Sequence, residues 1–180
     1  MIYVFLGTGF EEVEALTVVD LLRRAELEVK TVGIGGRLVT GSHEIPVMAD
    51  LSEEEADPAG TEMIVLPGGM PGTLVLEKSE LVQHFVALAV QNRLWIGAIC
   101  AAPSILGHLG LLKGRQATCY PGFECQLPGA LPSEEPVVQD GSIITSRGVG
   151  TAIPFALKLV EVLTSRERAD KLAASIVWER

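Results

Sequence analysis

Residues 94–112, LWIGAICAAPSILGHLGLL, place one cysteine between an apolar run and a segment with helical spacing. The run 94–99 is apolar enough for a buried strand, and residues 103–112 predict a helix directly behind it. Small residues flank Cys100 on both sides, which allows a sharp turn, and Pro103 suits the first turn of a helix. The stretch therefore predicts a strand–turn–helix unit with Cys100 at its corner.

The same alternation of apolar strands and amphipathic helices runs through the whole chain. A capping box formed by Thr8 and Glu11 predicts the start of the first helix. Because the strands are apolar throughout, they indicate a mostly parallel sheet with helices on both faces, a three-layer α/β sandwich. No repeat or linker divides residues 1–180, so we expect a single domain. Strands are expected at 2–6, 28–35, 62–69, 94–99, 115–120 and 137–146, a hairpin at 38–50, and helices at 8–25, 79–92, 103–112, 151–165 and 166–178.

Composition excludes several classes of partner. The 180 residues are 48% hydrophobic and carry a net charge of −9, with 14 basic against 23 acidic residues. An acidic surface without a basic cluster disfavours nucleic acid, and no apolar run approaches the ~20 residues of a membrane span. The N-terminus lacks the basic leading region of a signal peptide. The chain has three cysteines, an odd number and too few for a disulfide framework. We expect a cytoplasmic protein that binds neither nucleic acid nor membrane.

Cys100 is the strongest candidate for chemistry. In a parallel sheet, ligands bind beyond the carboxyl ends of the strands, which is where Cys100 falls. A thiol at a helix N-terminus lies at the positive end of the helix dipole, which favours the thiolate. The alternative is a buried structural cysteine, a common role for free thiols.

Two further features lie at the same edge of the expected sheet. Gly68 and Gly69 follow a buried strand, so their backbone N–H groups could bind an oxyanion, or they could form an ordinary turn. Glu14 lies among apolar residues in the first helix, where burial raises a carboxyl pKa and lets the group stay protonated. Its neighbours Glu11 and Glu12 suit a solvated helix start.

The three histidines do not supply a base for Cys100. His108 lies on the same predicted helix, about 12 Å along its axis from Cys100. His84 is expected at the surface or at its boundary, and His43 lies in the hairpin. No pair of Cys or His residues has the spacing of a metal site, and GIGGR at 33–37 lacks the spacing of a dinucleotide loop. We therefore expect no metal and no cofactor.

Five motifs, in order along the chain, resemble the DJ-one/ThiJ/PfpI superfamily and most closely its YajL-like bacterial branch. The motifs are GFEEVEALTVVDLLRRA at 9–25, VLPGGMPG at 65–72, IGAICAAPSILGHLGLLKG at 96–114, ATCYPG at 117–122 and SRGVGTAIPFALKLVEVL at 146–163. The resemblance implies a flavodoxin-like fold with a nucleophile elbow. It also implies a homodimer formed through Arg24 and the hairpin, in which His43 approaches the partner's pocket.

The resemblance further implies roles for four residues of the site. Cys100 matches the reactive cysteine, and Glu14 matches the glutamate that hydrogen-bonds the sulfur and shuttles a proton. The backbone amides of Gly69 and Ala101 match the groups that bind an oxyanion. These roles agree with the chemistry argued above for the residues themselves.

The chain departs from the family pattern at two positions. Tyr120 stands where several relatives have a histidine, and a tyrosine hydroxyl is a poor base near neutral pH. Ala101 stands where the protease-like branch has a histidine, so peptidase activity is not expected. Cys119, next to Tyr120, could be a resolving thiol or a half-buried strand residue.

Two functions fit these residues. The first is a stress-protection enzyme, a cofactor-free glyoxalase or deglycase in which Cys100 attacks a methylglyoxal-type 2-oxoaldehyde or its adducts. The second is a non-enzymatic sensor of oxidative stress, or a redox-regulated chaperone, in which Cys100 oxidises to a sulfinate. The expected pocket comprises Gly68, Tyr120, Cys119 and His43 besides the four residues with assigned roles.

Overall fold

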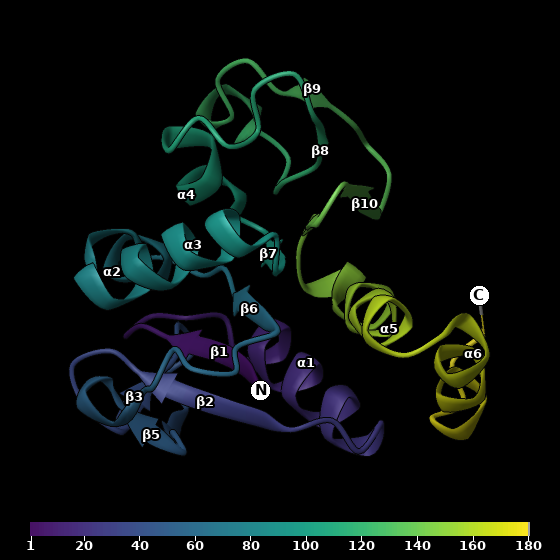
Figure 1. The fold of residues 1–180 in the computed structure, drawn as a ribbon, viewed down its shortest axis with the longest axis horizontal. Coiled ribbons are helices and arrows are strands. Elements are labelled where there is room, and N and C mark those ends of the chain that lie inside the picture. The colour runs from purple at the N-terminus through teal and green to yellow at the C-terminus, as the bar shows by residue number, and fades with distance from the viewer. Residues whose placement is uncertain (180) are drawn as a thin grey trace.

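A seven-stranded sheet forms the centre of the protein, shown by a computed structural model that describes residues 1–179 (Figure 1). The strand order is β10-β11-β7-β6-β1-β2-β5, and every neighbouring pair is parallel except β10 with β11. The strands are β1 Ile2–Leu6, β2 Val29–Gly33, β5 Leu51–Ser52, β6 Met63–Leu66, β7 Trp95–Ile99, β10 Val137–Asp140 and β11 Ile143–Ser146. The expected mostly parallel sheet is confirmed.

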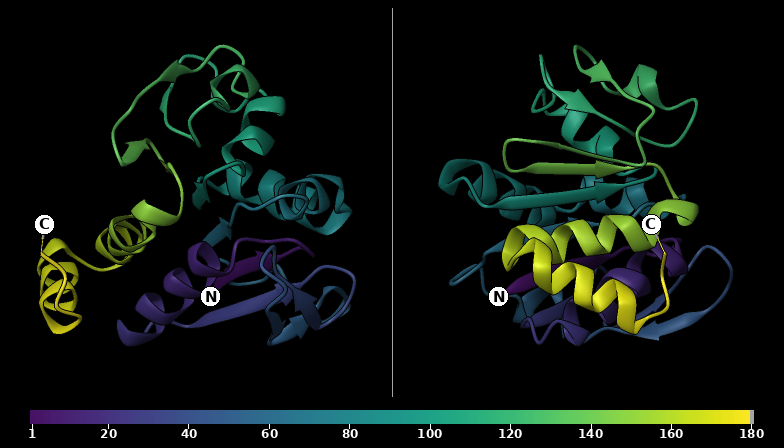
Figure 2. Two further views of the ribbon diagram at one scale, coloured as in Figure 1. Left: turned by 180° about the vertical axis from the view of Figure 1, so that it is seen from behind. Right: turned by 90° about the vertical axis from the view of Figure 1, so that its right-hand side faces the viewer.

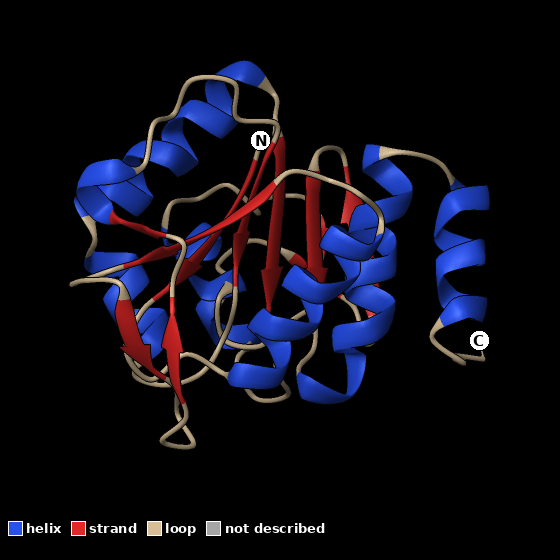
Figure 3. Cartoon of the chain, turned by 90° about the horizontal axis from the view of Figure 1, so that it is seen from below, coloured by secondary structure: helices blue, strands red, loops and turns tan. Residues whose placement is uncertain are grey.

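Helices cover both faces of this sheet and make it the middle layer of three (Figures 2 and 3). One apolar core joins the sheet to α1, α5 and α6, and a second joins it to α2, α3 and α4. The helices are α1 Glu12–Arg24, α2 Gly72–Lys78, α3 Glu80–Asn92, α4 Pro103–His108, α5 Ala152–Leu163 and α6 Arg166–Ser175, with short 3-10 turns η1 Glu53–Glu55, η2 Glu124–Gln126 and η3 Val149–Thr151. The three-layer α/β sandwich is confirmed.

The central strands are apolar because both of their faces are covered. All five residues of β1 are buried, and β1 pairs in parallel with both β2 and β6. β6 in turn pairs in parallel with β7. The carboxyl ends of β1, β6 and β7 therefore meet at one edge, where α1, the two glycines and Cys100 follow.

Two small ribbons lie outside the main sheet: β3 Leu38–Thr40 with β4 Pro46–Met48, and β8 Gln116–Ala117 with β9 Leu131–Pro132. The β3–β4 hairpin is attached to the loop before α1. Gly9 N donates to Thr40 O at 2.8 Å, and Ser42 N donates to Phe10 O at 2.8 Å. These bonds bring the hairpin tip next to the first turn of α1.

The structure corrects the expected start of the first helix. The N-cap of α1 is Glu11, whose side chain accepts a hydrogen bond from Glu14 N, so Thr8 and Glu11 do not form a capping box. Glu11 N donates to Gly68 O at 2.9 Å, so it does not donate to the side chain of Thr8 as a capping box requires. The helix begins after Glu11 instead.

Three other segments also differ from the expectation: two elements are shorter than expected, and one helix was not expected. The helix expected at 103–112 ends at His108, the strand expected at 115–120 shrinks to β8, and α2 was not predicted. No helix in the described part of the chain is both long and apolar enough to span a membrane.

Candidate active site

Cys100 lies at a strained corner between β7 and α4. Its φ is +63°, a left-handed value that non-glycine residues rarely adopt. The corner is held by Cys100 N, which donates to Ser146 O at 3.0 Å, and by Tyr120 N, which donates to Cys100 O at 2.8 Å. Ala101 and Ala102 are buried directly behind it. This is the strand–turn–helix geometry that the sequence predicts.

Glu14 lies beneath Cys100 and is completely buried. Gly68 N donates to Glu14 Oε2 at 2.9 Å, and the carboxyl group lies close enough to the thiol of Cys100 for the thiol to lower its pKa. Oε1 is buried with no hydrogen-bond partner among the described residues. Burial raises the pKa of Glu14 to about 7, so the carboxyl group can hold a proton near neutral pH.

The two glycines allow the backbone to approach this pair closely. A Cβ at Gly68 would lie 2.5 Å from Cys100 Cβ and 2.7 Å from Glu14 Oε2. Gly69 has a φ of +90°, and a Cβ there would collide with Glu11 N. The backbone N–H groups of Gly69 and Ala101 lie close enough to the sulfur to lower the pKa of the thiol. The four residues with predicted roles, Cys100, Glu14, Gly69 and Ala101, thus lie together with Gly68.

The thiol and the carboxyl group compete for one proton. Burial, and then the carboxylate of Glu14, raise the pKa of Cys100 to about 12, although the amides of Gly69 and Ala101 lower it. This direction is opposite to the expected effect of the helix dipole, because burial and the nearby carboxylate outweigh it. A reactive thiolate therefore requires that the proton move to Glu14, which also removes the repulsion between the two charges.

A pocket of about 520 Å³ opens above the pair. Tyr120, half-exposed, forms part of its wall. Arg147 and the backbone that follows it also line the pocket, but the sequence analysis did not predict them as site residues. The signal that could have found them is their position in the SRGVG motif, directly after β11 at the same sheet edge. The pocket is lined by Glu11, Glu14, Cys100, Tyr120, Pro121, Arg147, Gly148, Val149, Gly150 and Thr151.

Cys119 does not line this pocket. It is 3% exposed and packs in the core on the α3–α4 face, whereas Cys100 packs against the core on the α1–α5 face. Burial raises the pKa of Cys119 to about 11. The two thiols thus pack with different cores, and a resolving role for Cys119 stays a prediction.

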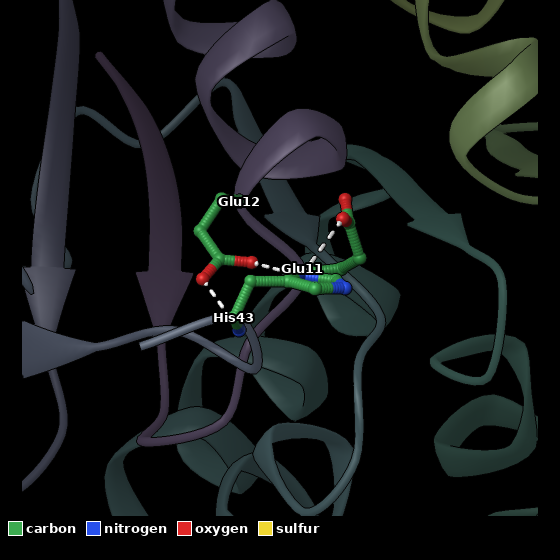
Figure 4. Close-up of side chains that lie close together, drawn as sticks. All are labelled: Glu11, Glu12 and His43. Carbon is green, nitrogen blue, oxygen red and sulfur yellow. Dashed lines mark hydrogen bonds and ion pairs between the residues drawn. The ribbon is translucent and has the colours of Figure 1, made fainter. Parts of the chain in front are cut away.

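His43 lies beside the pocket rather than in it. Its Nδ1 lies 2.9 Å from Glu12 Oε2 and 3.7 Å from Glu11 Oε1, so the imidazole stands between the two carboxylates (Figure 4). Burial alone would raise the pKa of Glu12, but hydrogen bonds, first among them the one from His43, lower it to about 2. Glu12 is therefore not the solvated residue that the sequence indicated.

The other two histidines lie on α3 and at the end of α4. His84 is exposed on α3. His108 pairs its Nδ1 with Glu77 Oε1 and its Nε2 with Gln126 Oε1 at 2.9 Å. Neither lines the Cys100 pocket.

Comparison with known proteins identifies the family. The model of the DJ-1/PfpI family matches residues 1–162. The chain belongs to this family. The family resemblance found in the sequence is confirmed, whereas the YajL-like branch stays a prediction.

Several members of the DJ-1/PfpI family are similar to this chain along nearly the whole length of both proteins. Protein dj-1beta of Drosophila melanogaster is 36% identical over 177 residues, which cover 97% of this chain and 95% of that protein. Glutathione-independent glyoxalase DJ-1 of Schizosaccharomyces pombe is 30% identical, with 96% and 95% covered. The structure of oxidized DJ-1 from Toxoplasma gondii superposes with a TM-score of 0.95 at 35% identity, covering 99% and 98% of the two chains. The flavodoxin-like fold of the family is thereby confirmed.

Proposed function

We propose that the protein is a cofactor-free glyoxalase of the DJ-1/PfpI family that converts small 2-oxoaldehydes such as methylglyoxal to hydroxy acids. The observation that carries the proposal is the close approach of the buried carboxyl group of Glu14 to the thiol of Cys100, at the base of an open pocket. The name of the Schizosaccharomyces pombe relative supports the same chemistry.

The reaction begins when the thiol proton moves to Glu14 and the thiolate attacks the aldehyde carbon. The carbonyl electron pair moves to oxygen, where the amides of Gly69 and Ala101 stabilise the charge until Glu14 returns the proton. The product of this step is a hemithioacetal. Both amides act on the sulfur and lower the pKa of the thiol, so they lie near the carbon that would bond to it.

The second stage transfers a proton between the two carbons. The carboxylate of Glu14 removes the hydrogen from the former aldehyde carbon, and the electron pair forms an enediol. Glu14 returns that proton to the neighbouring carbon, and the hydroxyl on the carbon bonded to sulfur loses its proton to the carboxylate as its C=O bond forms, which gives a lactoyl thioester. Water hydrolyses the thioester to lactate while the Cys100 thiolate leaves. One carbon is oxidised and the other reduced, so no external oxidant or reductant is required.

Repair of glycated adducts, the deglycase reaction, would use the same residues on a larger substrate. Tyr120, in place of a histidine, supplies an aromatic wall and a hydroxyl donor rather than a base. Proton transfer therefore falls to Glu14. Peptidase activity is not expected, because Ala101 stands where the protease-like branch has a histidine.

The test is lactate formation from methylglyoxal by metal-free wild type, Cys100→Ala and Glu14→Gln. Cys125→Ala serves as the control, because Cys125 is an exposed thiol outside the pocket. Turnover should disappear in the first two variants and persist in the control. Absence of turnover in wild type, or equal turnover in all four proteins, would overturn the proposal.

A redox-responsive stress protein is the second candidate, and the contacts around the sulfur favour it. The amides of Gly69 and Ala101, and a protonated Glu14, would donate hydrogen bonds to sulfinate oxygens on Cys100 as well as to a substrate oxyanion. Negligible turnover together with rapid conversion of Cys100 to the sulfinate by peroxide, measured by intact mass, would favour this function or a redox-regulated chaperone.

We also propose a homodimer formed by α1 and the β3–β4 hairpin. Large apolar side chains are exposed on these elements: Val13, Leu16, Leu38, Ile45 and Met48. Leu38→Asp with Met48→Asp should then convert a dimer to a monomer in light scattering, and a monomeric wild type would contradict the proposal. A cytoplasmic location, and the absence of nucleic-acid partners, follow from charge and composition and stay predictions.

A further inference from the structure

Three side chains beside the Cys100 pocket point their ligand atoms at one place. Glu11 Oε1, Glu12 Oε2 and His43 Nδ1 all lie within 4.8 Å of one another (Figure 4). We propose that Glu11, Glu12 and His43 bind a divalent transition-metal cation of the Zn²⁺ type. This site goes beyond the proposed function, which needs no metal.

Both carboxylates are held in place before any ligand binds. Glu11 Oε2 accepts a hydrogen bond from Glu14 N at 2.8 Å, and Glu12 Oε1 accepts one from His43 N at 2.8 Å. The second oxygen of each carboxylate is thereby directed toward the imidazole. Backbone hydrogen bonds that orient the outer oxygen of a metal-binding carboxylate are a common feature of such sites.

One of the two inner oxygens lacks a hydrogen bond. The side chain of Glu11 is only 10% exposed, and its Oε1 lies 3.7 Å from His43 Nδ1, too far for a hydrogen bond. No other donor among the described residues reaches this oxygen. A neutral imidazole has only one N–H, which Glu12 Oε2 already receives at 2.9 Å. A cation in place of the Nδ1 proton would contact both carboxylates, whereas that single proton can be donated to only one of them at hydrogen-bond distance.

The donor set selects the kind of cation. One imidazole nitrogen and two carboxylate oxygens suit Zn²⁺ and its transition-metal neighbours, whereas Mg²⁺ and Ca²⁺ prefer oxygen ligands alone. Tetrahedral Zn²⁺ with bonds near 2.0–2.1 Å separates its ligand atoms by about 3.3 Å. The observed 2.9 and 3.7 Å bracket that value. The side chain of His43 is 68% exposed, so it can adjust its position, and water can complete the coordination.

The local backbone is built for this close approach. Gly41 lies in the hairpin, where a Cβ would collide with the carboxylate of Glu12. Ser42 N donates to Phe10 O at 2.8 Å and fixes the hairpin tip against the start of α1. His43 therefore reaches Glu11 and Glu12 through tertiary contacts that no spacing motif in the sequence reveals. The sequence-based expectation that no metal binds rested on such spacing alone.

The test is titration of the chelator-stripped full chain with ZnCl₂ by calorimetry and with CoCl₂ by absorption spectroscopy. We expect one ion per chain in wild type, and an affinity at least tenfold weaker in His43→Gln and in Glu12→Gln. His84→Gln replaces an exposed histidine on α3, and it should bind as wild type does. Circular dichroism of each variant checks that the hairpin and α1 remain folded.

Cysteine thiols are the competing ligands for these ions. Cys100→Ala and Cys125→Ala should each retain the affinity of wild type, which would assign the ion to the carboxylate–imidazole cluster. The proposal is overturned if wild type does not bind, if His43→Gln and Glu12→Gln bind as wild type does, or if either cysteine variant abolishes binding. Because lactate formation is measured on metal-free protein, failure of this site leaves the proposed glyoxalase activity unaffected.

Discussion

Glu14 and Cys100 lie against the same glycine, Gly68, although they come from α1 and from the end of β7. The parallel strands β1, β6 and β7 end side by side, so the first turn of α1 and the turn after β7 meet over Gly68. Gly68 N donates to Glu14 Oε2 at 2.9 Å and fixes the carboxyl group below the sulfur. The topology of the sheet thus creates the thiol–carboxyl pair.

Gly68→Ala should abolish turnover, because its methyl group would displace both Cys100 Cβ and Glu14 Oε2. Steady-state kinetics with methylglyoxal measure the loss. Gly110→Ala is the control: it places a methyl group in open space at a φ of +72° and should cost about 1 kcal/mol of stability while leaving turnover unchanged. Full activity in Gly68→Ala would show that close packing at this glycine is not needed.

Thr145→Val should destabilise the protein by about 1–3 kcal/mol, because Thr145 Oγ1 accepts the buried backbone N–H of Thr118 at 2.9 Å. Thr118→Val is the matched variant. The Oγ1 of Thr118 is buried without a hydrogen-bond partner among the described residues, so its removal should be neutral or stabilising. Urea unfolding measures both, and equal losses in the two variants would contradict this account.

Asp50→Asn should lower stability at neutral pH by about 1–2 kcal/mol. Asp50 Oδ2 accepts hydrogen bonds from Thr31 N, Thr31 Oγ1 and Arg23 Nη2 at 2.8, 2.9 and 2.6 Å. Burial alone would raise the pKa of Asp50, but these bonds and the nearby positive charges outweigh burial and lower it.

The sign of the pH dependence follows from this lowered pKa. A carboxyl group whose folded pKa lies below its ordinary value, near 3.9, stabilises the protein above about pH 4, and the contribution disappears as pH falls through the folded pKa. The difference between wild type and Asp50→Asn should therefore shrink in urea unfolding at about pH 3. Glu28→Gln, at an exposed position, should show no such difference at either pH. A gap that stays constant with pH would contradict the assignment.

Much of the fold could be predicted because its signals are local. The strands of the parallel sheet are apolar along their whole length, and Pro103 with its small neighbours marks the turn at Cys100. The capping box at Thr8 failed because a tertiary bond, Glu11 N to Gly68 O, decides where α1 begins. Helix α2 was missed because it is short and follows glycines and prolines that predict a turn.

In the candidate site, too, local sequence signals predict some features, whereas others depend on tertiary contacts. Cys100, Glu14 and Gly69 could be found because each follows a strand at one sheet edge. The pKa of Cys100 could not be predicted, since it depends on burial and on the carboxyl group beneath the sulfur. The contact of His43 with Glu12 depends on how the hairpin folds back onto α1, which sequence spacing does not encode.

The most direct test of the central claim is a double-mutant cycle on methylglyoxal turnover with Cys100→Ala, Glu14→Gln and the double variant. If the thiol and the carboxyl group act as one unit, each single variant should reduce kcat/KM to the same residual value as the double variant. Losses that add, or a Glu14→Gln variant that keeps the wild-type kcat/KM, would contradict a Cys100–Glu14 enzyme.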